Sequence, residues 1–369
     1  GYIELVTATS EVEADDIQPE YIDLFAKSEF VLSDSNTLSI HTLLNLDKDT
    51  CINRCATALS SDSLASHFWL NLQTEWSDAI SSTLLVGTAE LENNRSGFEQ
   101  NQLLILGNYQ IEQAEEFYSV DDRLTWRFDI LKQDWQVKLA ENQLLKAGLE
   151  YRQLEAEYLY NSTFQLFNYF SPINSQPELL IRSENLTPKG DTTAAYLSHL
   201  FKLTKELSIE SGVRWDKQSY TNDTQLSPRL NLQYLTGSGS SIRFSWGIFH
   251  QSQGIHQLAI QDSQSVFNKA EKVNQVNFSY TKKLSDSLRF DLGLYSKSYN
   301  NLRPRYENLL GINNLFYEAD DLRAQVSPDS AKAKGLELSL AQSGNKRFNW
   351  SVHYALTEAK DNIDGQPVS

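Results

Sequence analysis

The chain has 369 residues, of which 40% are hydrophobic, and carries a formal net charge of −16. This charge argues against a nucleic-acid partner, because binding to nucleic acid depends on neutralising phosphates with Lys and Arg. No run of residues approaches the roughly 18 apolar positions that a membrane-spanning helix needs. That excludes helical membrane proteins but not proteins that cross a membrane with strands, whose residues are only half apolar.

Strands are predicted along the chain wherever apolar and polar residues alternate, because successive side chains of a strand point to opposite faces. Counting this way gives about fourteen strands, and no helical pattern of comparable strength competes with them. Three acidic segments lack the alternation and are expected to be solvated loops: EVEADD (11–16), EQAEEF (112–117) and EADDLR (318–323). The alternation is clearest in TLSIHTLLNL (37–46), LSIESGVRWDK (207–217), SIRFSWGI (241–248), LRFDLGLYSK (288–297), GLELSLA (335–341) and FNWSVHYAL (348–356).

Short and long connections alternate between these strands. The short ones are rich in turn residues and predict tight hairpins at 203–207, 236–240, 284–287 and 343–346. The long polar ones are predicted at 92–119, 159–190, 252–270 and 300–330. An outer-membrane barrel has short turns at one end and long loops at the other, with aromatic girdles between, which suits Trp76 and Trp215. A soluble β-sandwich or propeller, with these Trp residues in its core, remains the alternative.

The two faces of the predicted strands differ in chemistry. We expect the nearly uncharged face to contact lipid and the face that mixes Arg, Glu, Asp and Gly to line a watery lumen. The expected lipid-facing residues are Ile242, Phe244, Trp246, Leu288, Phe290, Leu292, Leu336 and Leu338. The expected lumen residues are Arg243, Arg289, Asp291 and Glu337, joined by Arg214, Arg229 and Glu210 in a charged ladder.

Several segments, in the right order, resemble parts of the barrel of a TonB-dependent outer-membrane receptor. They are LKQDW (131–135), LLKAGLEYR (144–152), LSPRLNLQY (226–234), WGIFHQSQGIHQLAIQD (246–262), LRPRYENL (302–309), SPDSAKAKGLELSL (327–340) and WSVHYALTEAKDNIDG (350–365). The resemblance implies an all-β fold, an antiparallel transmembrane β-barrel of about twenty-two strands with short periplasmic turns and long extracellular loops. About fourteen of those strands would lie in residues 1–369, a partial barrel domain.

The chain departs from this family pattern at both ends. It contains no Met and begins at Gly1, so we expect an internal piece of a longer protein. The plug domain and the short box that engages the energy-transducing complex are absent, with about three strands missing before Gly1 and about five after Ser369.

The resemblance also implies a function. The parent protein would sit in the outer membrane of a Gram-negative bacterium and take up a scarce nutrient such as a ferric siderophore, cobalamin or an oligosaccharide. Its partners would be the lipid bilayer, the nutrient (a metal chelate in some cases) and the TonB complex, reached through the missing N-terminal region. A surface binding or adhesion protein and a passive channel are the alternatives.

No enzymatic motif is present, so we expect no catalytic, cofactor or metal site. Candidate ligand contacts lie in two of the long connections, at Gln251, Gln253, Arg303, Arg305 and Tyr306, because forked donors and amphipathic aromatics suit polar cargo. The alternative is that the two Arg residues order their loop through pairs with Glu307 and its neighbours.

Cys51 and Cys55 are the only cysteines. They lie in a polar segment after the strand at 37–46, and two thiols four positions apart on an oxidising cell surface can close a small loop. We therefore expect a Cys51–Cys55 disulfide, with free thiols as the alternative.

Overall fold

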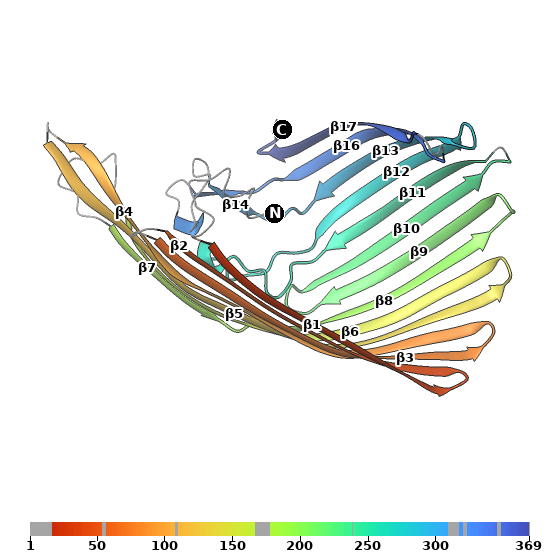
Figure 1. Ribbon diagram of the computed structural model, residues 1–369, viewed down its shortest axis with the longest axis horizontal. Helices are drawn as coiled ribbons and strands as arrows, with labels where there is room; N and C mark the ends of the chain where they lie inside the picture. Colours follow the sequence, from red (N-terminus) through yellow and green to blue (C-terminus); the bar gives the residue numbers. More distant parts are fainter. Residues whose placement is uncertain are drawn as a thin grey trace.

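The computed structural model describes residues 17–53, 57–107, 110–166, 178–237, 239–308, 317–319, 323–344 and 348–368. Within these ranges one antiparallel sheet of sixteen strands dominates, beside a separate two-stranded sheet (Figure 1). The described part contains no helix long and apolar enough to cross a membrane. The first strands are β1 (Ile17–Ser33), β2 (Asn36–Asn53), β3 (Thr57–Ser77), β4 (Ile80–Gly107), β5 (Gln110–Ala140), β6 (Gln143–Leu166), β7 (Glu178–Leu186), β8 (Lys189–Lys202), β9 (Leu207–Gln218) and β10 (Asp223–Leu235).

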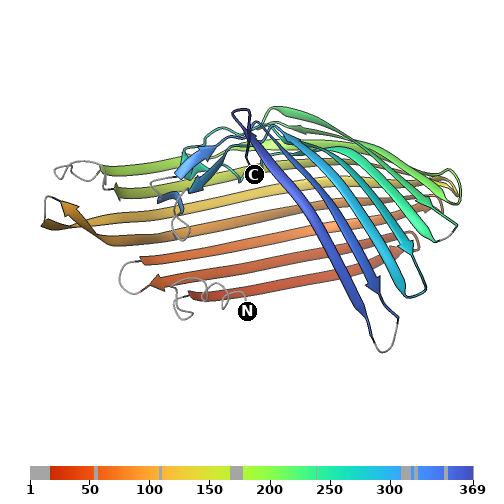
Figure 2. The same cartoon turned by 90° about the horizontal axis from the view of Figure 1, so that it is seen from above.

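The remaining elements include two short 3-10 helices in connections. They are β11 (Ser240–Gln251), η2 (Ile260–Asp262), β12 (Glu271–Lys283), β13 (Leu288–Asn300), β14 (Arg305–Asn308), η3 (Tyr317–Ala319), β15 (Arg323–Val326), β16 (Ser330–Gln342), β17 (Trp350–Ile363) and β18 (Gln366–Val368). Neighbours in the large sheet follow chain order, except that β7 and β8 both pair with β6 and that β14 and β15 pair with each other. The sheet curves strongly without closing (Figures 1 and 2). This confirms the predicted antiparallel barrel wall.

The two ends of the sheet carry different connections, as predicted. Short turns after β1, β3, β5, β8, β10 and β12 lie at one end, which we call the turn end. The hairpins predicted at 203–207 and 284–287 are among them, and so is the one at 236–240 apart from residue 238. That residue and part of 343–346 lie outside the described residues. The connections 252–270 and 300–330 both lie at the opposite, long-loop end, since β11 and β13 run in the same direction.

Two of the predicted long loops are wrong. Residues 92–119 continue β4 and β5, which stay paired as far as Gly107 and Gln110. In the segment 159–190, β6 continues to Leu166 and β7 pairs with it. The strands extend beyond the apolar band, where neither face meets lipid, so a strict alternation of apolar and polar residues is no longer required. The alternation is therefore absent from this part of the sequence, although β4 and β5 remain paired through backbone hydrogen bonds.

The register places the two predicted sets of residues on opposite faces. Leu292 lies opposite Tyr280 and Leu338, in a row that also contains Ile242, whereas Asp291 lies opposite Thr281 and Ser339. The same alternation assigns all eight apolar residues to one face and all the charged ones to the other. The charged face is concave, because it is continuous with the face of β6 on which the connections rest inside the curve (Figure 1).

Aromatic side chains border the apolar convex face. Trp76 beside the β3–β4 turn is 67% exposed and Trp215 near the end of β9 is 36% exposed. Exposure of this size fits the interfacial girdle and not the core position that was the alternative.

Glycines on the concave face make room for tyrosines of adjacent strands. A Cβ on Gly148 would lie 2.2 Å from the ring of Tyr196, and a Cβ on Gly335 would lie 2.4 Å from the ring of Tyr295. Cys51 lies within β2 and not in a loop; its side chain and the whole of Cys55 lie outside the described residues, so the disulfide stays a prediction.

Candidate functional site

The candidate site lies on the concave face at the long-loop end. There the connection after β11 (252–270) and η3 (317–319) rest against the inner side of β4, β5 and β6 (Figure 1). The other described parts of the connection after β13 (301–308 and 323–329) contact the connection after β11 through Arg303 and Arg323. We call these segments together the inner loop assembly. The assembly rests on the wall through apolar contacts, hydrogen bonds and ion pairs.

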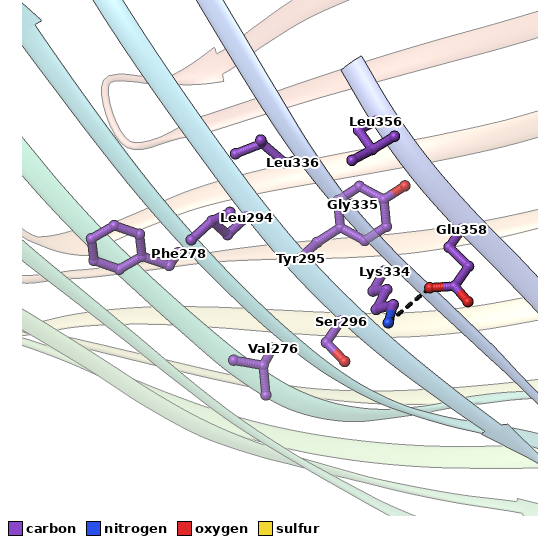
Figure 3. A pocket seen from close by; sticks show the side chains of 10 residues that line it. All are labelled: Val276, Phe278, Leu294, Tyr295, Ser296, Lys334, Gly335, Leu336, Leu356 and Glu358. Atoms are coloured by element: carbon purple, nitrogen blue, oxygen red, sulfur yellow. Dashed lines mark ion pairs between the residues drawn. The ribbon is translucent and has the colours of Figure 1, made fainter. Parts of the chain in front are cut away.

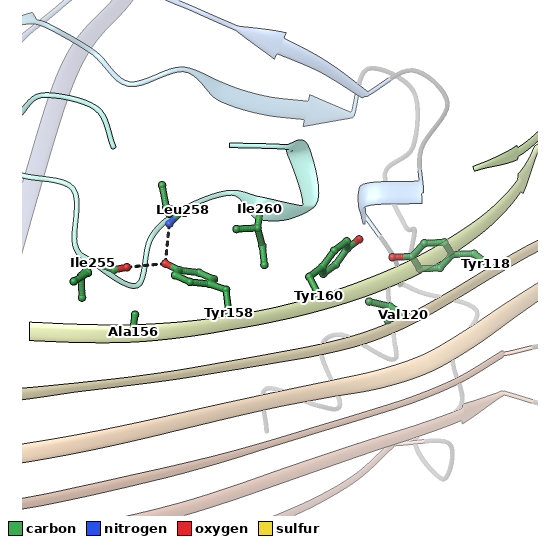
Figure 4. Close-up of a cluster of buried hydrophobic side chains, with 8 residues drawn as sticks. All are labelled: Tyr118, Val120, Ala156, Tyr158, Tyr160, Ile255, Leu258 and Ile260. Carbon is green, nitrogen blue, oxygen red and sulfur yellow. Dashed lines mark hydrogen bonds between the residues drawn. The ribbon is translucent and has the colours of Figure 1, made fainter. Parts of the chain in front are cut away.

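A buried tyrosine fastens the connection after β11 to the wall. Tyr158 of β6 donates a hydrogen bond from its hydroxyl to the carbonyl oxygen of Ile255 at 2.8 Å, and accepts one from the backbone N–H of Leu258 at 3.1 Å. Ile255 and Leu258 are buried with Ile260 among the wall side chains Tyr118, Val120, Ala156, Tyr158 and Tyr160 (Figure 4). Burial raises the pKa of Tyr158, which therefore keeps its donor proton at neutral pH.

The connection after β11 is also ordered internally. Gln253 is only 2% exposed; its side-chain amide donates to the carbonyl of Gln257 at 2.7 Å and accepts from the N–H of Asn268 at 2.7 Å. The hydroxyl of Tyr220 donates to the Gln253 carbonyl at 3.0 Å. The buried side-chain amide of Gln253 thus joins both ends of the segment. Burial raises the pKa of Tyr220 to about 12.

An ion pair fastens the connection after β13 to the wall. Arg95 of β4 donates to both carboxylate oxygens of Glu318 in η3, with Nη1 3.2 Å from Oε2, and also lies 3.3 Å from Asp122 of β5. The side chain of Glu318 is 1% exposed, so the expectation of a solvated acidic loop at 318–323 is wrong for this residue. Burial alone would lower the pKa of Arg95, but the hydrogen bonds and charge of Glu318 outweigh it and raise that pKa.

A second ion pair joins the two connections to each other. Arg323 of β15 contacts Asp262 of η2 through two hydrogen bonds, Nε to Oδ1 at 2.7 Å and Nη2 to Oδ2 at 2.8 Å. Its guanidinium also lies over the rings of Tyr317 at 5.1 Å and Tyr306 at 5.6 Å. The guanidinium of Arg95 also lies over the ring of Tyr317, 5.5 Å from its centroid. Cations and aromatic rings therefore alternate across the assembly.

A histidine of the assembly stacks on the wall. The ring of His256 lies 4.1 Å from that of Trp126 of β5, with 16° between the planes. Burial lowers the pKa of His256, so the neutral imidazole is the form that packs here.

The predicted ligand contacts lie near one another but differ in their surroundings. Gln251 is exposed at the end of β11, whereas Gln253 is occupied within its loop. Arg303 donates to Glu271 at 3.2 Å and to Gln257 at 3.1 Å. Arg305 pairs with Glu307, as the loop-ordering alternative expected, and with Asp361 of β17 at 2.8 Å.

Below the assembly, the concave wall carries paired charges. Asp134 accepts from the hydroxyl of Tyr196 at 2.6 Å and pairs with Lys132 at 2.9 Å, and Arg214 pairs with Asp216 at 2.8 Å. A cavity of about 640 Å³ opens among these strands, lined by Lys132, Lys146, Tyr196, Glu210, Arg214 and Arg229. Within the described ranges, no three His, Cys, Asp or Glu side chains are grouped to hold a metal ion.

Sequence reasoning missed the residues that hold the assembly in place. Tyr158 and Arg95 are far in the chain from their partners. Arg95 lies in a segment that was expected to be a loop, and Tyr158 lies directly before another. The available signal was the inward set of apolar and aromatic residues on β5 and β6, Tyr118, Val120 and Tyr160, which had no lipid to face.

Comparisons with known proteins agree with this architecture. The family description "TonB dependent receptor-like, beta-barrel" matches residues 47–369. No curated protein matches the chain. Similar solved structures include the outer membrane transporter YddB from Escherichia coli (TM-score 0.67, 10% identity, covering 94% of this chain and 49% of that one). The ferric-catecholate import receptor Fiu from E. coli K12 (0.62, 11%, 94% and 58%) and the RagAB peptide importer (0.59, 12%, 94% and 47%) are similar too.

The chain thus spans about half the length of these structures, whose likeness at such low identity concerns the fold. The family match covers most of the chain and agrees with the curved antiparallel wall, the apolar convex face and the unequal connections. The chain belongs to the TonB-dependent receptor β-barrel family.

Proposed function

We propose that the chain forms part of the barrel of a Gram-negative outer-membrane receptor that imports a scarce nutrient with energy supplied through the TonB complex. The observation that carries the proposal is the inner loop assembly. Two long connections fold back over the concave face and are held there by Tyr158 and by the Arg95–Glu318 pair. A wall whose own loops cover its lumen suits selective capture better than free diffusion or adhesion by extended loops. Family members and the similar structures are receptors and transporters, which supports a role other than catalysis.

The nutrient would be met by polar and aromatic groups of the assembly. We propose Gln251, Arg303, Arg305 and Tyr306 as contacts, since each lies at the rim and carries groups that bind anionic or polar cargo. We assign Gln253 a different role, because its side chain is buried and its hydrogen bonds hold the loop 252–270 in place. Ferric siderophores, cobalamin and oligosaccharides remain in the range of cargo, and the peptide importer among similar structures adds peptides.

Energy-dependent uptake is tested in cells that express the full-length parent protein. Labelled ferric siderophores, cobalamin, oligosaccharides and peptides are supplied one at a time, with and without a proton uncoupler. We expect accumulation of one class that stops when the uncoupler is added. Accumulation that continues with the uncoupler would indicate a passive channel, and surface binding without accumulation would indicate an adhesion protein.

The part played by the loops is tested with the same cells. Replacing Arg303 and Arg305 by Gln should weaken ligand binding while leaving barrel assembly intact. A matched control is Gly237→Ala in the β10–β11 turn at the other end, where an added Cβ meets nothing within 4 Å. Weaker binding in the turn variant, with unchanged binding in the loop variants, would reverse the orientation assigned to the barrel.

A further inference from the structure

Two adjoining depressions lie on the convex face across β12, β13, β16 and β17. The first, of about 480 Å³, has a mainly apolar surface, and the second, of about 380 Å³, is lined mostly by charged and hydroxyl- or amide-bearing residues. Ser296, Lys334 and Glu358 line both, so the two are continuous. The apolar part is lined by Val276, Phe278, Leu294, Leu336 and Leu356 (Figure 3), and the polar part by Ser330, Lys332, Lys360 and Asn362.

The change from apolar to polar happens at one level on neighbouring strands. Leu294, Leu336 and Leu356 form one row across β13, β16 and β17. The next row on the same face, towards the long-loop end, is Ser296, Lys334 and Glu358, and the row after it is Ser298, Lys332 and Lys360. In a transmembrane barrel the end of the apolar band marks the boundary between hydrocarbon and headgroups. The joint depression therefore crosses that boundary in the outer leaflet.

Its polar part is cationic in a chain that is strongly acidic overall. Glu358 is paired with Lys334 at 2.7 Å and also with Lys360. The other carboxylate nearby, Asp361, is held by Arg305 at 2.8 Å. No carboxylate in the described ranges pairs with Lys332. With Asp361 balanced by Arg305, the three ammonium groups and the carboxylate of Glu358 leave a local charge of +2, against −16 for the whole chain.

We propose that this joint depression binds a phosphate-bearing lipid of the outer leaflet. An acyl chain would lie against Phe278, Leu294 and Leu336 and make van der Waals contacts with them. The lipid phosphate would accept hydrogen bonds from Lys332 and Lys360, since ammonium groups at the headgroup level attract anionic lipids. The site differs from the nutrient site, because the two lie on opposite faces of the wall.

The test uses the full-length protein in detergent micelles and a defined probe, a diphosphorylated glucosamine disaccharide lipid. Its affinity is measured by titration and by native mass spectrometry. We expect Lys332→Gln combined with Lys360→Gln to weaken binding about twenty-five-fold, since each Lys near an anionic surface contributes about a factor of five. The same lipid without phosphates should bind the unaltered protein no better than the phosphorylated lipid binds this double variant.

The matched control is Lys282→Gln. Lys282 is on the same strand set and the same convex face, but at the turn end of the apolar band, opposite Ser240 and Phe290. It should leave the affinity within about twofold, which is the scatter expected for a surface charge. Equal binding by the double variant, or equal weakening by Lys282→Gln, would overturn the proposal. So would a dimer of the protein that the double variant abolishes, because a second copy would then occupy the depression.

Discussion

At the scale of single residues, the buried Arg95–Glu318 ion pair joins β4 to a loop that is distant in the chain. Glu318 lies in an acidic run, which usually means a solvated segment, yet its partner Arg95 is 223 positions away. Pairing over such a distance depends on the curvature of the sheet and on the path of a loop. Neither has a local signature.

The Arg95–Glu318 pair should be essential for placing the connection after β13. Arg95→Met leaves the buried carboxylate without its main cation, which costs about 3 kcal/mol or more locally. We expect backbone amides of 323–326 to exchange with solvent about a hundredfold faster, measured by hydrogen exchange and mass spectrometry. Arg95→Met combined with Glu318→Gln should recover part of the loss, because no charge is then stranded. Equal, additive effects of the two substitutions would contradict a coupled pair.

Gly148 should be intolerant of even one methyl group. Alanine there would place its Cβ 2.2 Å from the ring of Tyr196, whose hydroxyl is held by Asp134 at 2.6 Å. Displacing the ring costs about 1–3 kcal/mol, the usual range for overpacking. The free energy of unfolding of the full-length protein in lipid vesicles, from urea titration, measures this. Gly237→Ala serves as the control, and a Gly148→Ala variant as stable as that control would show that the close contact is not needed.

At the scale of elements, the sequence predicted strands well where one face meets lipid and poorly beyond it. The strands at 207–217, 241–248 and 288–297 are recognisable because a lipid-facing outer surface and an aqueous inner surface impose a period of two on the sequence. Outside the membrane both faces of β4 and β5 meet water or loops, so the same backbone structure lacks the pattern. The long connections at 252–270 and 300–330 were placed correctly, but their inward folding was not predicted.

The alternation itself is tested by two adjacent substitutions on β16. Leu338 lies on the convex face opposite Leu292 and Tyr354, and Ser339 lies on the concave face opposite Asp291. Leu338→Arg should destabilise the barrel by about 2–4 kcal/mol, because it places a cation in the hydrocarbon. Ser339→Arg should be tolerated beside a carboxylate. Urea titration in vesicles compares the two, and a larger loss at Ser339 would mean that the faces are reversed.

Mild acid should loosen the connection after β11. Burial against Trp126 lowers the pKa of His256 below its usual value of 6.5, so the unfolded loop binds the proton more readily than the packed one. The contribution of neutral His256 to the stability of the packed loop is therefore complete above about pH 6.5. It is lost as the pH falls through the lowered pKa of His256. Hydrogen exchange of 252–270, corrected for its intrinsic pH dependence, should rise between pH 7.5 and pH 5. His256→Gln should remove the change, and a variant that kept it would exclude His256 as the cause.

At the scale of the whole molecule, the wall is uneven. β4 and β5 have 28 and 31 residues, whereas β9 and β11 have 12 each. A tilted strand needs only about ten residues to cross a membrane, so more than half of β4 and β5 lies outside it. The strands themselves and the two unlike ends could be predicted from alternation and turn residues. The length of the strands on this side of the barrel could not be predicted, because strand residues outside the membrane show no alternation of apolar and polar side chains.

The central claim is that the convex face meets lipid and the concave face lines an aqueous lumen. Single cysteines are introduced into the full-length protein, with Cys51 and Cys55 replaced by Ser, at the convex positions Ile242, Leu292 and Leu336 and at the concave positions Arg243, Asp291 and Glu337. Each variant in intact membranes is treated with a water-soluble maleimide. We predict rapid labelling of the three concave positions and little labelling of the three convex ones until the membrane is dissolved. Equal labelling of both sets would contradict the barrel.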